Sequence, residues 1–331
     1  MARQDGNSET EFDLIARLFA PLSDSPHGLN LTDDVGLVPN TDGRSCITSD
    51  MIVAGVHFLA DDPADQIAQK LVRVNISDLA AKGAQPVGCV LSAAFNQQRD
   101  ISWLEAFAKG LATDLATFGL VLIGGDTVRT PGPDTFSLTA IGRLGEGAMV
   151  TRAGARAGDG LYVTGTIGDA GLGLRILRGE LGAVALGTRT RLEGRYRLPQ
   201  PRVDFGRRLS GFASASLDVS DGLIADAGHL AEASGLAARI DFDRVPLSSS
   251  ATRVVKKDRS LHLSLMGAGD DYEILFAAPA DAAEAIAEAS GNTETPVTRI
   301  GDLAPGKAGE VSVVDGQGMT LDVPKMGYRH F

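Results

Sequence analysis

The stretch PADQIAQKLVRVNISDLAAKGAQP, residues 63–86, gives the first indication of the fold. Its apolar residues recur at helical spacing and predict a helix from Pro63 to about Ala81. Gly83 and Pro86 end this helix, because glycine and proline are typical of helix C-termini. A β-rich run at Val87–Ala94 follows at once and predicts a strand. A helix that leads directly into a strand favours an α/β protein.

The segments on either side continue this alternation as far as about residue 145. An opening helix is predicted around residues 12–19. The further predicted elements are a strand at Cys46–Val53, a helix at Ser102–Thr117, and strands at Leu120–Ile123 and Phe136–Leu144. We therefore expect one layer of helices on one face of a sheet in this part of the chain.

A second α/β unit is predicted after a glycine- and alanine-rich boundary, which divides the chain into domains 1–148 and 149–331. Its predicted strands are Leu161–Thr164, Ser216–Val219, Tyr272–Ala277, Pro296–Ile300 and Val311–Val314. Its predicted helices lie near Leu174–Arg178, Val203–Leu209, Gly222–Ala233 and Ala280–Ala289. The expected fold class is thus α/β (α+β) with two domains.

Composition excludes several classes of protein. With 42 acidic against 31 basic residues and a net charge of −11, the 331-residue chain is a poor candidate for binding nucleic acid. No run of about 18 apolar residues occurs and residues 1–10 are polar, so we expect no membrane span, no signal peptide and a cytoplasmic location. Cys46 and Cys89 make neither a disulfide framework nor a zinc site, and five scattered histidines predict no histidine-based metal site.

Aspartate is in large excess over glutamate, 30 residues against 12. Many of these aspartates stand beside Gly, Ser or Thr at the ends of apolar runs, where α/β proteins place ligands. They are Asp33, Asp34, Asp50, Asp78, Asp126, Asp218, Asp221, Asp270 and Asp271. Carboxylates are the ligands that Mg²⁺ prefers, so these positions indicate several Mg²⁺ ions and a phosphate-bearing substrate. The alternative is a set of ordinary solvent-exposed loop residues.

Three stretches of sequence can be interpreted either as part of a functional site or as an ordinary structural feature. Ile123-Gly-Gly-Asp-Thr127 suits a backbone that approaches a phosphate beside a Mg²⁺-binding carboxylate, or an ordinary turn. Asp78 lies on the apolar arc of its helix, which favours a buried polar site over a simple i,i+4 pair with Lys82. The glycine-rich segment 165–173 suits an anion at a helix N-terminus, or a tight turn. No phosphate-binding loop or dinucleotide fingerprint is present, so the residues alone indicate a Mg²⁺-dependent nucleotide enzyme.

Six motifs occur in the order found in a known family. Together they resemble the thiamine-monophosphate kinases, which belong to the aminoimidazole-ribonucleotide-synthetase-like superfamily. The motifs are Thr48–Met51 with Gly55–Phe58, Asn75–Ala84, Gly124–Thr127, Arg152–Asp159, Leu217–Leu223 and Gly269–Glu273. The resemblance implies an N-terminal sheet that pairs with its copy in a homodimer, and a C-terminal α/β domain that completes the active site.

The resemblance further implies ATP-dependent phosphorylation of thiamine monophosphate to thiamine diphosphate, by direct in-line transfer assisted by several Mg²⁺ ions. It names no catalytic side chain, since clustered cations can neutralise the two phosphates. The implied Mg²⁺ ligands are Asp33, Thr48, Ser49, Asp50, Asp78, Asp126, Asp218 and Asp221. The implied ATP contacts are Gly125, Asp126, Arg152 and Ser220, and the implied thiamine monophosphate contacts are His57, Glu273 and Tyr328.

Two departures from the family pattern keep alternatives open. Asn30-Leu-Thr-Asp-Asp34 stands where the family has Gly-Ile-Gly-Asp-Asp, and Ala108 stands where an aromatic residue that contacts the nucleotide often occurs. One alternative is another synthetase of the superfamily, although a selenophosphate synthetase needs an N-terminal cysteine and none precedes Cys46. The other alternative is a nucleotide-binding protein without turnover.

Overall fold

The computed structural model describes residues 15–23, 44–256, 258–323 and 327–328. Asp33 and the altered motif at residues 30–34 lie outside these ranges. The chain divides into two compact units, which are described separately. The first contains Ile47–Asn75 and Pro86–Gly142, and the second contains Gly43–Cys46, Ile76–Gln85 and the chain from Arg143 onward.

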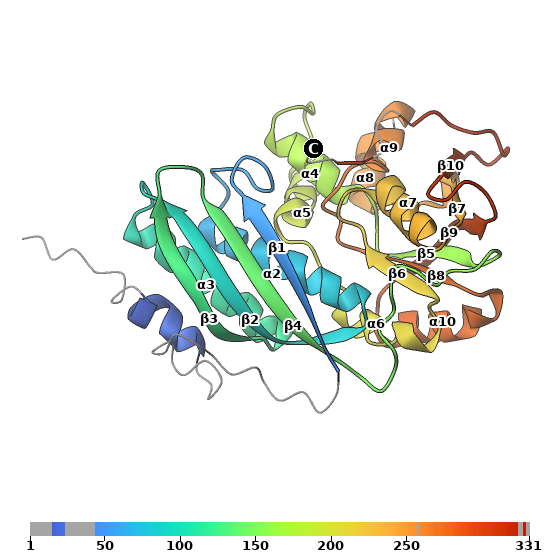
Figure 1. Cartoon of the computed structure of the whole chain (residues 1–331). Coiled ribbons are helices and arrows are strands. Elements are labelled where there is room, and N and C mark those ends of the chain that lie inside the picture. The colour runs from blue at the N-terminus through green and yellow to red at the C-terminus, as the bar shows by residue number, and fades with distance from the viewer. Residues whose placement is uncertain (1–14, 24–43, 257, 324–326, 329–331) are drawn as a thin grey trace, which may run out of the picture. The chain divides into compact units, whose positions relative to one another are not determined.

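The first unit is built on a four-stranded sheet in the order β1-β4-β2-β3. The strands are β1 (Ser45–Val53), β2 (Ala84–Asn96), β3 (Val121–Thr130) and β4 (Thr135–Leu144). The helices α2 (Ala64–Ala81) and α3 (Ile101–Phe118) lie on the same face of this sheet in Figure 1. The predicted element order is confirmed, and the predicted opening helix is represented by two short helical turns, η1 (Ile15–Phe19) and η2 (Ala20–Ser23).

Local contacts fix the two ends of α3 and its position on the sheet. The Asp100 side chain caps the helix by accepting a hydrogen bond from the Trp103 N–H at 2.9 Å. Gly119 ends the helix in the left-handed conformation, at φ 66°. Phe107 of α3 packs on Phe136 of β4, with ring centroids 4.7 Å apart. This aromatic contact marks which face of the sheet the helix covers.

The second unit contains a six-stranded sheet in the order β10-β7-β9-β5-β8-β6. β10 pairs with β7 in parallel, and the other neighbouring strands pair antiparallel. The strands are β5 (Gly160–Thr164), β6 (Ala215–Asp218), β7 (Ala237–Asp241), β8 (Ile274–Ala278), β9 (Val297–Ala304) and β10 (Val311–Val314).

Both faces of this sheet are covered at β5 and β8, which explains why every residue of these two strands is buried. Leu161, Val163 and Leu275 belong to one core cluster together with side chains of α7 (Leu223–Ala233). Tyr162 and Phe276, from the same two strands, belong to a second cluster with side chains of α10 (Ala283–Asn292). Alternate residues of a strand point to opposite faces, so each strand contributes to both clusters.

The remaining helices are short and follow the strands closely. They are α4 (Asp169–Leu177), α5 (Leu186–Arg197), α6 (Val203–Gly206), α8 (Ser249–Val255) and α9 (Arg259–Leu265). Among the α-helices and strands of this unit, α5, β7, α8 and α9 were not predicted from the sequence, and neither was the short turn η5 (Phe242–Arg244).

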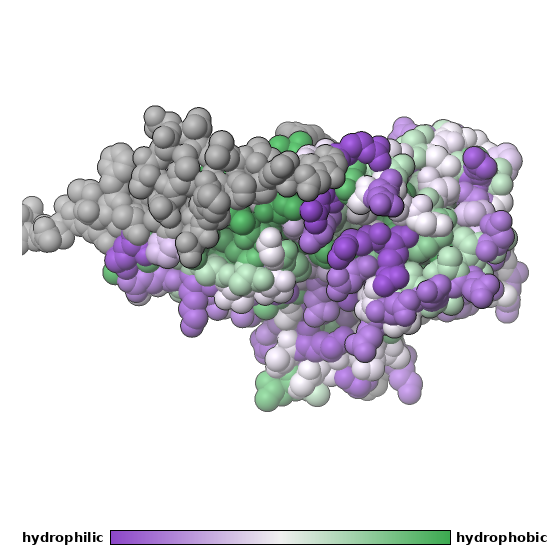
Figure 2. Space-filling view, turned by 90° about the horizontal axis from the view of Figure 1, so that it is seen from below, coloured by the Kyte–Doolittle hydropathy of each residue, from purple (hydrophilic) through white to green (hydrophobic). Residues whose placement is uncertain are grey.

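Outside the residues drawn in grey, Figure 2 shows hydrophilic and hydrophobic residues interspersed on this face, with a hydrophobic patch near the middle of the view. Large apolar side chains are exposed on the two edge strands of the first sheet: Ile47 and Met51 on β1, and Val128 on β3. Among the described residues, the helices are too short or too polar to cross a lipid bilayer.

Candidate active site

The predicted site residues fall into two groups, one in each unit. Thr48, Ser49, Asp50, His57, Gly125 and Asp126 belong to the first unit. Asp78, Arg152, Asp218, Ser220, Asp221, Glu273 and Tyr328 belong to the second unit. Asp33 lies outside the described residues.

On β1, a buried amide fixes the backbone at Asp50. The Asp50 N–H donates to Asn75 Oδ1 at 2.9 Å, and Asn75 is fully buried in α2. Ser49 points the other way, since its Oγ lies 3.0 Å from Thr139 Oγ1 on the neighbouring strand. Successive residues of a strand face opposite sides, so Thr48 and Asp50 lie on the side that the helices cover and Ser49 lies on the open side. The side chains of these three predicted ligands are thus not all brought together.

Asp126 lies on the open side of the sheet. β2 and β3 run parallel, with Ser92 beside Asp126 and Leu91 beside Gly125. Phe95 of β2 packs on Phe107 of α3, so odd-numbered β2 residues near it face the helices and Ser92 faces away. Asp126, in register with Ser92, is exposed on that open side. Asp126 therefore lies on the same face of the sheet as Ser49 and on the face opposite to Asp50.

The Gly124-Gly125-Asp126 segment corrects the prediction of a strand that ends at Ile123. β3 continues through both glycines to Thr130, so these residues belong to a strand and not to a turn. A Cβ placed on Gly125 would lie 2.1 Å from the Leu91 carbonyl oxygen, whereas one on Gly124 would meet no atom within 4 Å. Only glycine at position 125 allows β2 and β3 to approach this closely.

His57 presents a defined ring nitrogen. Its Nδ1 accepts a hydrogen bond from the Val53 N–H at 3.1 Å, and its carbonyl accepts one from the buried Lys70 Nζ at 2.8 Å. A ring whose Nδ1 is an acceptor carries its proton on Nε2 when neutral. His57 can therefore offer an Nε2–H donor, which suits an oxygen atom of a substrate. Ala108, where the resemblance has an aromatic residue, is buried in α3.

In the second unit, Asp78, Arg152 and Asp218 converge on a residue that sequence reasoning did not assign to the site. This residue is Lys82, whose Nζ donates to the carbonyl of Ser216. Burial lowers the pKa of Lys82, and nearby Arg152 lowers it further, while the carboxylates of Asp218 and Asp78 act to raise it. The structure thus brings three predicted site residues into one electrostatic group. The only signal in the sequence was the i,i+4 spacing of Asp78 and Lys82.

A further carboxylate, Asp226 in the first turn of α7, lies against the turn after β6. Its Oδ2 accepts hydrogen bonds from the N–H groups of Asp221 and Gly222, both at 3.1 Å. Burial raises the pKa of Asp226 well above its ordinary value, and the charges of Asp218 and Asp221 add to this effect. The motif residues at this turn are therefore held against a buried acid that the sequence analysis did not single out.

The same turn departs from the expectation of no histidine-based metal site. Asp221, Asp226 and His229 offer ligand atoms that all lie within 4.8 Å of one another, and within the described ranges they form the one such group. Asp226 and His229 are three residues apart on α7, a spacing that places both on one helix face. That spacing was the available signal for the group.

Two other motif segments meet this turn. The Ser220 carbonyl accepts a hydrogen bond from the Asp270 N–H at 2.9 Å, and Asp270 has a positive φ of 71°. The Tyr328 N–H donates to the Asp221 carbonyl at 2.9 Å, which places the Tyr328 backbone beside the turn. A positive φ in a residue other than glycine is costly and persists where surrounding contacts hold it. Ser220, Asp221 and Tyr328 are thus brought together.

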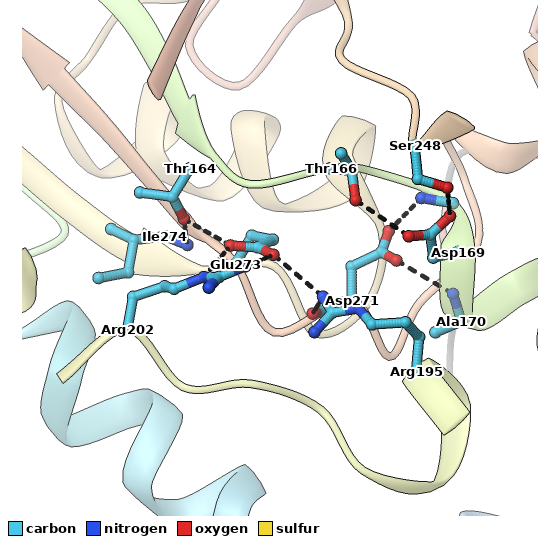
Figure 3. A network of polar contacts seen from close by, with 11 residues as sticks. Thr164, Thr166, Asp169, Ala170, Arg195, Arg202, Ser248, Asp271, Glu273 and Ile274 are labelled. Atoms are coloured by element: carbon cyan, nitrogen blue, oxygen red, sulfur yellow. Dashed lines mark hydrogen bonds and ion pairs between the residues drawn. The ribbon is translucent and has the colours of Figure 1, made fainter. Parts of the chain in front are cut away.

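Glu273 occupies the centre of the buried polar network in Figure 3. It is fully buried, and Arg202 donates to it from Nε at 2.7 Å and from Nη2 at 2.6 Å. Arg195 Nη2 donates to it at 3.0 Å and Thr164 Oγ1 at 2.7 Å. Its carboxylate is thus engaged inside the protein, where it fixes two arginines. A direct contact with a substrate stays a prediction for this residue.

The glycine-rich segment 165–173 does bind an acid at a helix N-terminus, but the acid is the protein's own Asp271. The Gly168 N–H donates to Asp271 Oδ2 at 2.7 Å and the Ala170 N–H donates to Oδ1 at 3.3 Å, as Figure 3 shows for Ala170. Complete burial raises the pKa of Asp271 to about 8, against the opposing effect of these two donors. The segment is therefore a turn whose N–H groups bind a carboxyl group, and that carboxyl group belongs to the protein itself.

The oxygen donors of this chain suit Mg²⁺. The half-buried Asp78 and Asp221 and the buried Asp218 of the second unit are all carboxylates. Hard oxygen ligands are those that Mg²⁺ prefers, usually one or two carboxylates together with phosphate oxygens and water. The residues present therefore fit this ion.

Comparison with known proteins finds relatives over most of the chain. The AIR synthase related protein N-terminal domain matches residues 32–144, and its C-terminal domain matches residues 156–314. A thiamine-monophosphate kinase from Caulobacter vibrioides is 44% identical over 303 residues, 90% of this chain and 85% of the relative. One from Escherichia coli is 39% identical over 97% of this chain and 98% of the relative. The chain belongs to the thiamine-monophosphate kinase family.

Solved structures of this family share the fold. The crystal structure of thiamine-monophosphate kinase from Stenotrophomonas maltophilia superposes with a TM-score of 0.81 at 37% identity, over 95% of this chain and 98% of that chain. A second, AaThiL complexed with AMPPCP and TMP, gives a TM-score of 0.76 at 29% identity and covers both chains fully. The two-domain fold and the family predicted from the motifs are confirmed. The predicted boundary at 148/149 falls between the two matched domains.

Proposed function

We propose that this chain transfers the γ-phosphoryl group of ATP to thiamine monophosphate and so forms thiamine diphosphate. The observation that carries the proposal is that the charges of Asp78, Asp218 and Arg152 all act on Lys82 in the second unit, in a chain that matches thiamine-monophosphate kinases over nearly its full length. The nucleotide analogue and TMP in the AaThiL complex support ATP and thiamine monophosphate as the two substrates.

The chemistry needs charge neutralisation more than proton transfer. Two phosphate groups repel one another, and phosphoryl transfer depends chiefly on positioning and on cations around the transferred group. When bound, Mg²⁺ supplies positive charge at the phosphate oxygens. The residues proposed to hold Mg²⁺ ions in the second unit are Asp78, Asp218 and Asp221. In the first unit they are Ser49 and Asp126 on the open face of the sheet and Thr48 and Asp50 on the face that the helices cover.

Other side chains bind and orient the substrates in this proposal. Arg152 is exposed and has a planar guanidinium that suits a phosphate of ATP. His57 offers its Nε2–H to the acceptor phosphate, and the half-exposed Tyr328 offers a ring face to the cationic thiazolium, a contact worth about 0.5–2 kcal/mol. Gly125, Asp126 and Ser220 also contact the nucleotide in this proposal. Transfer is direct, with no phosphorylated residue.

The open face of the first sheet supports a homodimer as part of the proposal. Ile47, Met51 and Val128 expose 69%, 54% and 50% of their surfaces. Ile47 and Met51 are each two positions from Ser49 along β1, and Val128 is two positions from Asp126 along β3. Residues two apart in a strand face the same side, so all three lie on the side away from α2 and α3. Apolar residues gathered on one sheet face are typical of protein interfaces. We propose that a second copy of this chain covers it.

A cytoplasmic location completes the proposal. Cys46 and Cys89 are not joined by a disulfide, which agrees with a reducing compartment. Small molecules are the proposed partners of the site, and the acidic surface disfavours nucleic acid.

The experiment is a direct assay of the product. Purified protein is incubated with ATP, Mg²⁺ and thiamine monophosphate, and thiamine diphosphate is quantified by chromatography after oxidation to its fluorescent thiochrome. We expect turnover, and a loss of more than about 100-fold in Asp126→Asn, because even an outer-shell partner of a metal typically costs 10–100-fold. Asp61→Asn, at an exposed position of the same unit, is the control. Absence of product from the unaltered protein, or near-normal turnover in Asp126→Asn, contradicts the proposal.

A further inference from the structure

The last turn of α2 holds a lysine in a fixed place. The Lys82 N–H donates to the carbonyls of Asp78 at 3.2 Å and Leu79 at 3.1 Å, so Lys82 continues the helix one turn beyond Asp78. Its side chain therefore lies on the same helix face as that of Asp78. The Nζ atom donates to the Ser216 carbonyl, two residues before Asp218 on β6. The ammonium is thus held near two proposed Mg²⁺ ligands, Asp78 and Asp218, whose charges act on it.

Ser216 is itself rigidly placed. It is fully buried, its N–H donates to the Thr151 carbonyl at 2.9 Å, and its Oγ donates to the Ala81 carbonyl at 2.7 Å. The first bond also fixes the chain beside Arg152. Main-chain bonds that lock an acceptor on both sides leave a lysine bound to it little freedom. The position of the Lys82 ammonium follows from the backbone and is not an arbitrary rotamer of a surface residue.

The hydrogen bond of Lys82 does not neutralise its positive charge. Within the described part of the chain, the neutral Ser216 carbonyl is the acceptor found for its ammonium, which has three N–H donors. Asp78 and Asp218 act on it at longer range, as does the positive charge of Arg152. A half-buried cation with remaining donors, beside carboxylates that suit Mg²⁺, is the arrangement expected for binding a phosphate.

We propose that Lys82 is a phosphate-binding residue of this site, a fixed cation that donates to a phosphoryl oxygen of the bound nucleotide near Asp78 and Asp218. The proposal rests on the kinase function proposed above. Before the nucleotide binds, the ammonium partly neutralises the two carboxylates and opposes the entry of Mg²⁺. Once the nucleotide is present, the same charge attracts its phosphates. Lys82 therefore acts in opposite directions on Mg²⁺ and on nucleotide.

This pair of opposite effects separates the proposal from a purely structural role. A lysine that only ties α2 to β6 would, when removed, loosen the site and weaken the binding of both ligands. Loss of a local positive charge instead strengthens the attraction of the carboxylates for a divalent cation. Loss of a charge-assisted hydrogen bond weakens the binding of the phosphate by about 10-fold or more.

The test uses Lys82→Met, with Lys82→Arg as the charge-retaining variant and Lys109→Met, at an exposed position of α3, as the control. Calorimetry measures Mg²⁺ binding without nucleotide, and then AMPPCP binding at saturating Mg²⁺. We expect Lys82→Met to bind Mg²⁺ more tightly and AMPPCP about 10-fold more weakly. We expect Lys82→Arg to restore AMPPCP binding, and Lys109→Met to match the unaltered protein in both titrations.

Two outcomes overturn the proposal. If Lys82→Met weakens both ligands and lowers the melting temperature, Lys82 is a structural tie. If both affinities are unchanged, Lys82 does not act on the site at all. The kinase assay on the unaltered protein is read separately: thiamine diphosphate formed without any effect of Lys82→Met leaves the function standing and removes the role of Lys82. If Lys82→Met binds Mg²⁺ more tightly and AMPPCP more weakly, but the unaltered protein forms no thiamine diphosphate, Lys82 is a nucleotide contact and the proposed kinase function is wrong.

Discussion

Replacing Glu273 with Gln removes the charge at the centre of the network in Figure 3 and nearly preserves its shape. The carboxylate has no exposure and takes two hydrogen bonds from Arg202, one from Arg195 and one from Thr164, between 2.6 and 3.0 Å. A glutamine amide puts an NH₂ group where an oxygen accepted. This NH₂ faces guanidinium donors, so at least one hydrogen bond is lost and two donors are set against each other.

The cost depends on where each arginine can go. The Arg202 side chain is 20% exposed and can turn toward water, whereas the Arg195 side chain is 7% exposed and cannot. Arg195 keeps one bond, to the Asp271 carbonyl at 3.2 Å, but loses its counter-ion. Removing one partner of a buried ion pair typically costs about 3–5 kcal/mol. We therefore expect Glu273→Gln to lower the free energy of unfolding by about 3–5 kcal/mol, a large part of the usual stability of a domain.

Urea unfolding followed by circular dichroism measures this change, with the exposed Glu284→Gln on α10 as the control. A double-mutant cycle with Arg195→Met isolates the pair: the double variant should lose less than the sum of the two single losses, because no unpaired charge stays buried. A loss below about 1 kcal/mol in Glu273→Gln would refute the reasoning. A higher KM for thiamine monophosphate with unchanged stability would instead favour the substrate contact predicted from the family resemblance.

Two further predictions concern the close strand contact and the buried acid. Gly125→Ala should lose stability by about 1–3 kcal/mol in the same urea assay and bind AMPPCP more weakly, because its Cβ would lie 2.1 Å from the Leu91 carbonyl oxygen. Gly124→Ala is the matched control with open space around its Cβ, and equal losses in the two variants would contradict the prediction. Asp271 has its pKa raised to about 8 in the folded protein, so between about pH 4 and pH 8 the folded state holds a proton that the unfolded state has released. Its contribution to stability should therefore fall by about 1.4 kcal/mol per pH unit across that window, and Asp271→Asn should lack this slope in urea unfolding at pH 5, 6 and 7. Parallel pH profiles of the two proteins would contradict the assignment.

Much of the fold could be predicted because apolar periodicity is visible wherever a helix or strand packs with apolar residues. Every element from β1 to β4 was predicted in the right order for this reason. α5 was missed because the pattern that it buries is partly polar: Thr188, Leu192, Arg195 and Tyr196 follow helical spacing, but two of the four are hydrophilic. Arg195 can be buried there because Glu273, 78 positions later, neutralises it. No local pattern contains that information.

The candidate site shows the same limit. Short motifs identified the residue types and their order along the chain, and hence the family. They did not reveal that Asp50 and Asp126 face opposite sides of one sheet, which depends on the register of β2 with β3. They also did not reveal Lys82, because its partner is a main-chain carbonyl that any residue at position 216 would carry. A contact made through a main-chain carbonyl does not depend on the side chain at that position, so the sequence does not reveal it.

The bonds that join Ser216 to the end of α2 also bear on how the chain folds. The Ser216 hydroxyl and carbonyl meet Ala81 and Lys82 across 135 and 134 positions of sequence. Contacts between residues so distant in sequence form late, since the entropy of closing a long loop must be overcome first. During synthesis, α2 and its strands can begin to pack long before Ser216 has left the ribosome. The contacts of Ser216 with Ala81 and Lys82 should therefore form later than the local packing of α2.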